Sequence, residues 1–217
     1  MGTRYPKTVF DIDCRDCPRL ASFLDKVKDE HSDYFCRPVP PFGDPKARLL
    51  IVGLAPGMHG ANRTGRPFTG DFAGIILYET LHRHGLASKP VSVSADDGLK
   101  LLDCRITNAV KCLPPQNKPK TGEIKQCNHY LLNEIRQMLP PGGVILALGK
   151  IAHDGVVRAM NAKLSQYKFA HGAVHAFDDF KLVDSYHASR YNTQTKRLTV
   201  KMFDEVVKKA KRLAQGT

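Results

Sequence analysis

The sequence lacks any long hydrophobic run. No apolar stretch among its 217 residues approaches the roughly 18 that a membrane-spanning helix requires, which excludes a helical membrane protein. The first eleven residues include Arg4, Lys7 and Asp11 and have no apolar core, unlike a secretory signal peptide. We therefore expect a cytoplasmic protein that has no membrane partner and acts as a monomer.

Cysteine is scarce and tryptophan is absent. Six cysteines in 217 residues are too few for a disulfide scaffold. In a cytosolic chain they are better interpreted as metal ligands or free thiols. With no tryptophan, aromatic contacts fall to ten phenylalanines and seven tyrosines.

Acidic residues are few compared with basic ones. Subtracting 21 Asp and Glu from 33 Lys and Arg gives a net charge of 33 − 21 = +12. Such an excess attracts polyanions, above all nucleic acid. A basic protein with no polyanionic partner is the alternative that composition leaves open.

Hydrophobic residues make up 42% of the chain, enough for one folded domain over residues 1–217. Short apolar runs alternate with segments of helical periodicity, the pattern of an α/β fold with a parallel sheet flanked by helices on both faces. Thr121 is the expected N-cap of the third helix. The expected strands are 48–54, 104–110, 144–148 and 181–185, and the expected helices are 14–30, 72–85, 121–138, 149–161 and 196–213.

Polar loops follow three of the expected strands, after Leu54, Val110 and Ser185. Ligands of parallel sheets bind outside the carboxyl ends of the strands. We therefore expect the three loops to converge on one crevice that carries the function.

The first of these segments, residues 53–74, has six glycines in 22 positions. Glycine lets the backbone approach a ligand closely, yet neither a Walker A motif nor GxGxxG is present, so nucleoside triphosphate hydrolysis has little support. Asp71 is its only acid and directly precedes an expected helix. It is therefore either a helix N-cap or a crevice residue, or both.

The other two loops carry polar side chains suited to a nucleic acid. Asn108 offers a donor and an acceptor that match a base edge, although a turn asparagine bonded to local backbone is equally consistent. His187 follows a strand end, where an imidazole donates to an anion or moves a proton, although a lone histidine is often structural. Arg190 and Tyr191 are placed to contact a phosphate backbone and wedge into a base stack.

Four cysteines have a spacing compatible with a metal site. Cys14 and Cys17 form CxxC, and Cys112 and Cys127 are separated by 14 residues, which is not a zinc-ribbon pattern. An iron–sulfur cluster tolerates such spacing, but zinc and unrelated thiols stay open on spacing alone. The unpaired cysteines at positions 36 and 104 are interpreted as small buried apolar residues.

Three motifs together resemble a known family. GLAPG-x-HG-x-NRTGRPFTGD, NAVKC-x-PP-x-N and HASRYN are similar to those of the uracil-DNA glycosylase superfamily, specifically its iron–sulfur-containing family 5. The resemblance spans the chain from Cys14 to the last helix. It implies a four-stranded parallel sheet and the excision of uracil, and of other deaminated bases such as hypoxanthine, from DNA.

The resemblance also implies roles for individual residues. A [4Fe–4S] cluster held by Cys14, Cys17, Cys112 and Cys127 would tie the N-terminal segment, residues 1–45, to the rest of the domain. The catalytic residues it implies are Asp71, His187 and Asn108. The substrate-binding residues are Gly53, Ala55, Gly57, Phe68, Asn108 and His187, and the DNA-binding residues are Arg63, Arg66, Ser189, Arg190, Tyr191 and Asn192.

One position departs from the wider superfamily. Its best-known members carry an acid directly after the first strand, where this chain has Ala55. The resemblance therefore implies that Asp71, further along the same loop, is the catalytic acid. Two alternatives remain. One is a DNA-binding module without enzymatic activity, held by a four-cysteine metal site, and the other is a glycosylase that prefers hypoxanthine or mismatched bases.

Overall fold

A single mixed sheet of six strands forms the centre of the computed structural model, which describes residues 5–216. The strand order is β1-β3-β2-β4-β6-β5, with β3, β2, β4 and β6 parallel and the two edge strands antiparallel. The predicted four-stranded parallel sheet is therefore the middle of a larger one. The strands are β1 (Phe42–Gly43), β2 (Leu49–Gly53), β3 (Cys104–Asn108), β4 (Gly143–Leu148), β5 (Val174–Ala176) and β6 (Phe180–Ser185).

All five predicted helices are present, with shifted ends. The first begins at Pro18 rather than Cys14, the last begins at Val200 with Thr199 as its N-cap, and Lys120 rather than Thr121 caps α4. Two short helices, α2 and α6, were not predicted. The helices are α1 (Pro18–Glu30), α2 (Ala61–Thr64), α3 (Phe72–Arg83), α4 (Thr121–Met138), α5 (Lys150–Ala159), α6 (Arg190–Gln194) and α7 (Val200–Ala214), and 3-10 turns occur at Pro115–Asn117 and Leu164–Gln166.

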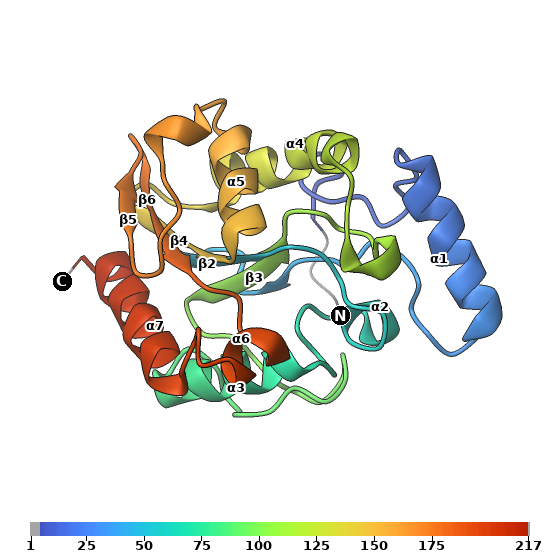
Figure 1. Cartoon of the computed structure of the whole chain (residues 1–217), viewed down its shortest axis with the longest axis horizontal. Helices are drawn as coiled ribbons and strands as arrows, with labels where there is room; N and C mark the ends of the chain where they lie inside the picture. Colours follow the sequence, from blue (N-terminus) through green and yellow to red (C-terminus); the bar gives the residue numbers. More distant parts are fainter. Residues whose placement is uncertain (1–4, 217) are drawn as a thin grey trace.

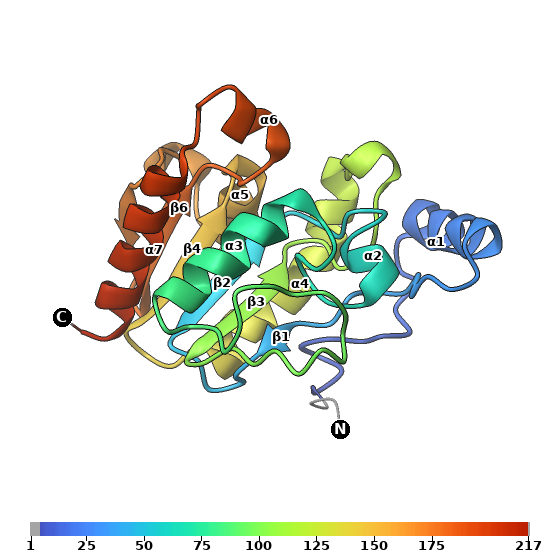
Figure 2. The same ribbon diagram turned by 90° about the horizontal axis from the view of Figure 1, so that it is seen from below.

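The sheet is covered on both faces, as predicted (Figure 2). Side chains alternate along β2: Leu49 and Ile51 join the core with α3 and α7, whereas Leu50 and Val52 join the core with α4 and α5. This two-residue period explains why the strand is apolar throughout. No described helix is both long and apolar enough to cross a membrane.

Helix α1 lies beside the layered part of the molecule rather than within it (Figure 1). Its apolar face packs on the segment after β3, with Leu20 against Val110 and Leu24 against Leu113. Residues 1–4 of the expected N-terminal segment lie outside the described residues. The rest of that segment meets the sheet where the second loop begins.

Candidate active site

The three loops converge at the carboxyl ends of β2, β3 and β6, as the sequence predicts. Together they surround a cavity of about 350 Å³. We call residues 54–71 the first loop, 109–120 the second and 186–195 the third. The lining residues are Leu54, Ala55, Gly57, Ala61, Phe68, Asp71, Phe72, Ala73, Asn108, Asn117, His187, Ser189 and Arg190.

Asp71 both caps a helix and lines the cavity. Its Oδ1 accepts the backbone N–H of Gly74 at 2.8 Å, which satisfies a donor in the first turn of α3. Burial raises the pKa of Asp71 above its usual 3.8, although the bonds from Gly74 and Ala73 oppose the rise. The two roles weighed from the sequence are thus compatible in one side chain.

Asn108 and Phe68 meet at Gly53, the last residue of β2. A Cβ at Gly53 would lie 2.4 Å from Asn108 Oδ1 and 2.7 Å from Phe68 Cζ, so only glycine leaves room for both side chains. Asn108 is 3% exposed, and no residue in the described range of 5–216 hydrogen-bonds its side-chain amide. Its donor and acceptor are therefore left for a ligand.

Phe68 has a strained backbone. Its φ of +54° is left-handed, which is unusual for an aromatic residue and is found most often at functional sites. The conformation brings its carbonyl so close to α3 that a Cβ at Gly74 would lie 1.8 Å from the Phe68 oxygen. In this position the Phe68 ring faces the cavity, 6.2 Å from the His187 ring.

His187 lies on the opposite wall, two residues after β6 ends. Asn192 Nδ2 donates to its backbone carbonyl at 2.8 Å, and Gly149 packs against its Cβ. Burial lowers the pKa of His187 below its usual 6.5, so the imidazole is neutral near pH 7. A neutral imidazole still has one N–H to donate into the cavity.

The third loop also forms one rim of the cavity. Tyr191 is 69% exposed at the surface of α6, and the Arg190 guanidinium lies over the Phe72 ring at 5.2 Å. Ser189 caps α6 by accepting the Asn192 N–H at 3.3 Å. Tyr191 therefore faces outward and Arg190 lies at the edge of the cavity, whereas Ser189 and Asn192 shape the loop.

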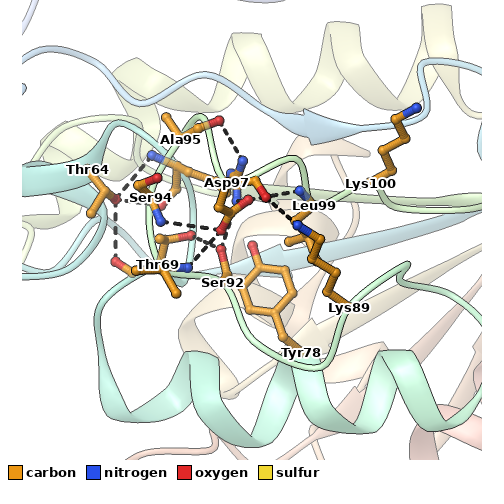
Figure 3. Close-up of polar contacts among 12 residues, drawn as sticks. Thr64, Thr69, Tyr78, Lys89, Ser92, Ser94, Ala95, Asp97, Leu99 and Lys100 are labelled. Carbon is orange, nitrogen blue, oxygen red and sulfur yellow. Dashed lines mark hydrogen bonds and ion pairs between the residues drawn. The ribbon is translucent and has the colours of Figure 1, made fainter.

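The two arginines of the first loop lie in different environments. Arg63 is exposed, and its Nε donates to the His59 carbonyl. Arg66 is 4% exposed and pairs with Asp97 at 2.8 Å inside the buried network of Figure 3, in which Ser92 bonds Thr69. The expectation that Arg66 contacts DNA is wrong, because its guanidinium is committed to this network.

Asn117 lines the cavity but was given no role in the sequence analysis. Gln116 and Asn117 both have left-handed backbones, with φ of +55° and +56°. These two strained residues present Asn117 to the cavity from the second loop. The sequence offered a sign of it, since an asparagine follows the diproline of the second motif.

The structure brings the four candidate metal ligands together. Cys14, Cys17, Cys112 and Cys127 line one small cavity between α1, α4 and the start of the second loop, and all are free thiols. Cys127 Sγ accepts the backbone N–H of Lys111, and burial raises the pKa of this thiol to about 11. The other two cysteines, at positions 36 and 104, are buried elsewhere, as expected.

Comparisons with known proteins identify the family to which the chain is similar. Residues 40–211 match the family described as the uracil DNA glycosylase superfamily. A type-5 uracil-DNA glycosylase from Thermus thermophilus is 47% identical over 207 residues, covering 93% of this chain and 94% of that protein. Proteins of the same description from Pyrobaculum aerophilum and Mycobacterium bovis are 42% and 44% identical, covering 92% and 93% of this chain and 88% and 78% of theirs.

Proposed function

Because the chain belongs to the uracil DNA glycosylase superfamily and matches type-5 members over most of its length, we propose that its crevice excises uracil from DNA. The reaction hydrolyses the N-glycosidic bond and leaves an abasic site. The observation that carries this proposal is the meeting of Asp71, Asn108 and His187 around one cavity. An enzyme thus replaces the alternative of a DNA-binding module without activity.

The cavity requires the target nucleotide to leave the helix. A base inside a duplex cannot reach side chains at the bottom of a crevice, so it must be flipped outward. Phe68 would stack on the flipped base, and the free amide of Asn108 would read its edge. Tyr191 and Arg190, on the rim, would contact the strand from which the base is withdrawn.

Bond cleavage separates charge, and in this proposal the side chains around the cavity stabilise both halves. The C1′–N bond breaks with its electron pair passing to the base, which leaves a cationic sugar. Water then bonds to C1′, and the proton that it loses balances the one that the base anion takes up. The Asp71 carboxylate would stabilise the cation, and the His187 N–H would stabilise the anionic base. One preorganised donor of this kind is worth roughly 2.7–4 kcal/mol.

The substrate range extends, in our proposal, to hypoxanthine and other deaminated bases. The lining combines one amide, one imidazole and one aromatic ring, and such a set can pair with more than one base edge. A panel of oligonucleotides carrying uracil, hypoxanthine or a thymine mispair tests this. Cleavage of the uracil oligonucleotide alone would restrict the activity to uracil.

The test of the main proposal is single-turnover cleavage of a uracil-containing duplex, followed by alkali. Asp71→Asn is expected to lower the rate about 100-fold, equivalent to about 2.7 kcal/mol. The DNA affinity and the melting temperature of this variant should match those of wild type, because asparagine also caps helices. The matched control is Asp178→Asn, an exposed acid in the β5–β6 turn. A wild-type rate for Asp71→Asn would remove the carboxylate from the mechanism.

We further infer that the four cysteines hold a [4Fe–4S] cluster. Thiolates are the usual ligands of both iron–sulfur clusters and zinc. Around one zinc ion, however, four sulfurs would lie about 3.8 Å apart, given a Zn–S bond of about 2.3 Å. Among the described residues, the only group of three or more ligand atoms all within 4.8 Å of one another belongs to His153, His175 and Asp184, so the four sulfurs do not form such a group. The wider sulfur spacing favours a larger inorganic core.

When bound, the cluster would supply a covalent tie between the N-terminal segment, the second loop and α4. Cys112→Ser is expected to lose iron and to melt at lower temperature, because metal binding is coupled to folding. Cys36→Ser is the matched control, since Cys36 lies outside this cavity. Stoichiometric zinc in protein purified without oxygen would overturn the cluster. The cytoplasmic location and the monomeric state stay predictions.

A further inference from the structure

The Asp71 carboxylate lies against a glycine of the first loop. A Cβ at Gly60 would lie 2.8 Å from Asp71 Oδ2 and 2.9 Å from Asp71 Cβ, closer than real side chains approach. On its other side, Asp71 Oδ1 bonds the Gly74 N–H. The carboxylate is therefore confined between Gly60 and the start of α3.

One reason for glycine at position 60 is space. Its φ of −100° lies outside the left-handed region, unlike Gly65 and Gly70 in the same loop, whose φ values are +75° and +81°. Its ψ of −112° nevertheless lies outside the helical and extended ranges, so the backbone also suits glycine, as it does at those two positions. Gly60 in addition leaves free the volume that the Asp71 side chain occupies.

The turn that carries Gly60 is fixed from three directions. His59 Nδ1 pairs with the Tyr34 hydroxyl at 2.9 Å, and the His59 carbonyl accepts from Arg63 Nε at 2.9 Å. Thr64 Oγ1 donates to the Gly60 carbonyl at 3.1 Å. A side chain added at position 60 would therefore displace Asp71 more readily than the turn itself.

The N-terminal segment takes part in this support. Tyr34 belongs to it and stacks on His31 with ring centroids 4.4 Å apart, and the Phe35 N–H bonds the Arg63 carbonyl at 3.1 Å. The segment that carries two of the four clustered cysteines thus also holds the wall behind Asp71. The wall therefore combines backbone hydrogen bonds and ring contacts with the side-chain bonds of Arg63 and Thr64.

We propose that Gly60 is a positioning residue for the reaction: its missing side chain sets where the Asp71 carboxylate sits beneath the substrate sugar. The proposal rests on the function assigned above to Asp71. A displacement of about 1 Å at a reacting group can cost ~100-fold in rate. The methyl of an alanine at position 60 would force a shift of that order, because 2.8 Å is well short of van der Waals contact.

The experiment is a double-mutant cycle measured by single-turnover uracil excision. Gly60→Ala is expected to lower the rate constant 30- to 100-fold, on the scale set by such a displacement. Its affinity for an abasic-site duplex should stay within about twofold of wild type, a separation that general unfolding would not produce. Gly122→Ala is the matched control, since a Cβ there meets nothing within 4 Å and Gly122 lies far along the chain in α4.

The second half of the cycle uses Asp71→Ser, which shortens the side chain and keeps a capping hydroxyl. In this background Gly60→Ala should change the residual rate less than twofold, because the group it displaces is gone. An undiminished loss there would show that Gly60 acts through the backbone of α2 and would overturn the proposal.

A milder variant tests the support from the N-terminal segment. Tyr34→Phe keeps the stack on His31 and removes the bond to His59, and a two- to fivefold loss of rate is expected at unchanged affinity. Wild-type rates for Gly60→Ala with a slow Asp71→Asn would overturn this inference alone. Wild-type rates for both would instead overturn the role of Asp71.

Discussion

At the scale of single residues, burial shifts two groups of the site in opposite directions. It raises the pKa of the Asp71 carboxyl and lowers that of the His187 imidazole. Paired shifts of this kind identify groups with different protonation roles. Near neutral pH the pair combines an anion beneath the sugar with an uncharged donor beside the base.

The pH dependence of excision follows from these directions. The excision rate should fall as the pH drops through the pKa of Asp71, which lies above 3.8, because protonation removes the carboxylate charge. The rate should not change between pH 8 and pH 6.5 through His187, because its pKa lies below its usual 6.5. Single-turnover rates measured from about pH 4 to about pH 9 check this, because that range covers the titration of both side chains. Asp71→Asn should flatten the acidic limb, and a limb that persists in this variant would point to another acid.

Some residue roles were readable from the sequence and others were not. Asp71 could be selected because it is the only acid of its loop, and Asn108 and His187 because each follows a strand. The role of Arg66 could not be predicted, because its burial depends on an ion pair with Asp97, which lies 31 residues further along the chain. An arginine in a glycine-rich loop has no local feature that distinguishes a DNA contact from a buried ion pair.

At the scale of elements, the segment between α3 and β3 is held by one carboxylate. Burial disfavours the charge of Asp97, but Arg66 and the N–H groups of Leu99, Val93 and Ser94 outweigh it and hold the pKa well below its usual 3.8 (Figure 3). Arg66 also donates to the Ala95 carbonyl. This network joins the segment to the part of the first loop that carries Phe68.

Breaking that network should destabilise the fold. Removing one partner of a buried ion pair typically costs about 3–5 kcal/mol, and we expect Asp97→Asn to fall near the lower figure. Urea denaturation measures it, with the exposed neighbour Asp96→Asn as control. Equal stability of the two variants would mean that Arg66 finds other acceptors.

A second buried network joins α5 to β5 and β6. His153 Nδ1 faces Asp184 Oδ1 at 2.7 Å, and its Nε2 faces the Tyr167 carbonyl at 2.8 Å, so both ring nitrogens meet acceptors. Both nitrogens can donate to these acceptors only when both carry a proton, so the contacts favour the cationic form of His153. Burial lowers the pKa of His153, but the bond and the charge of Asp184 outweigh it and raise the value above 6.5.

The stability contribution of this cation has a defined pH window. Because the folded-state pKa is raised, the contribution is complete below pH 6.5 and is lost as pH rises through the folded-state value. The melting temperature of wild type should fall over this interval more than that of His153→Gln. Parallel curves for the two proteins would show that His153 is neutral in the fold.

Elements that show a clear apolar run or helical periodicity were predictable from the sequence, and the shortest elements were not. The parallel strands β2, β3, β4 and β6 each fill one run of buried side chains. The edge strands have two and three residues, and α2 and α6 have four and five, too few for a period to show. Tertiary contacts, rather than local pattern, define them.

At the scale of the whole molecule, the excess positive charge should govern DNA binding. The chain carries 33 Lys and Arg against 21 Asp and Glu, and Arg190 and Arg63 lie exposed near the crevice. Each phosphate that a cation neutralises releases condensed counterions, so affinity falls as salt rises. Binding to an abasic-site duplex between roughly 50 and 200 mM salt should give a clearly negative slope of log K against log salt.

Two substitutions locate that slope on the molecule. Arg190→Ala should make it shallower by about one phosphate contact, since the side chain lies on the rim of the cavity. Lys181→Ala should leave it unchanged, because Lys181 is exposed near the start of β6, at the end of the sheet opposite the crevice. If both variants changed the slope equally, the attraction would come from net charge alone. A slope near zero in wild type would instead mean that base and ring contacts, with Phe68 and Tyr191 foremost, provide the affinity.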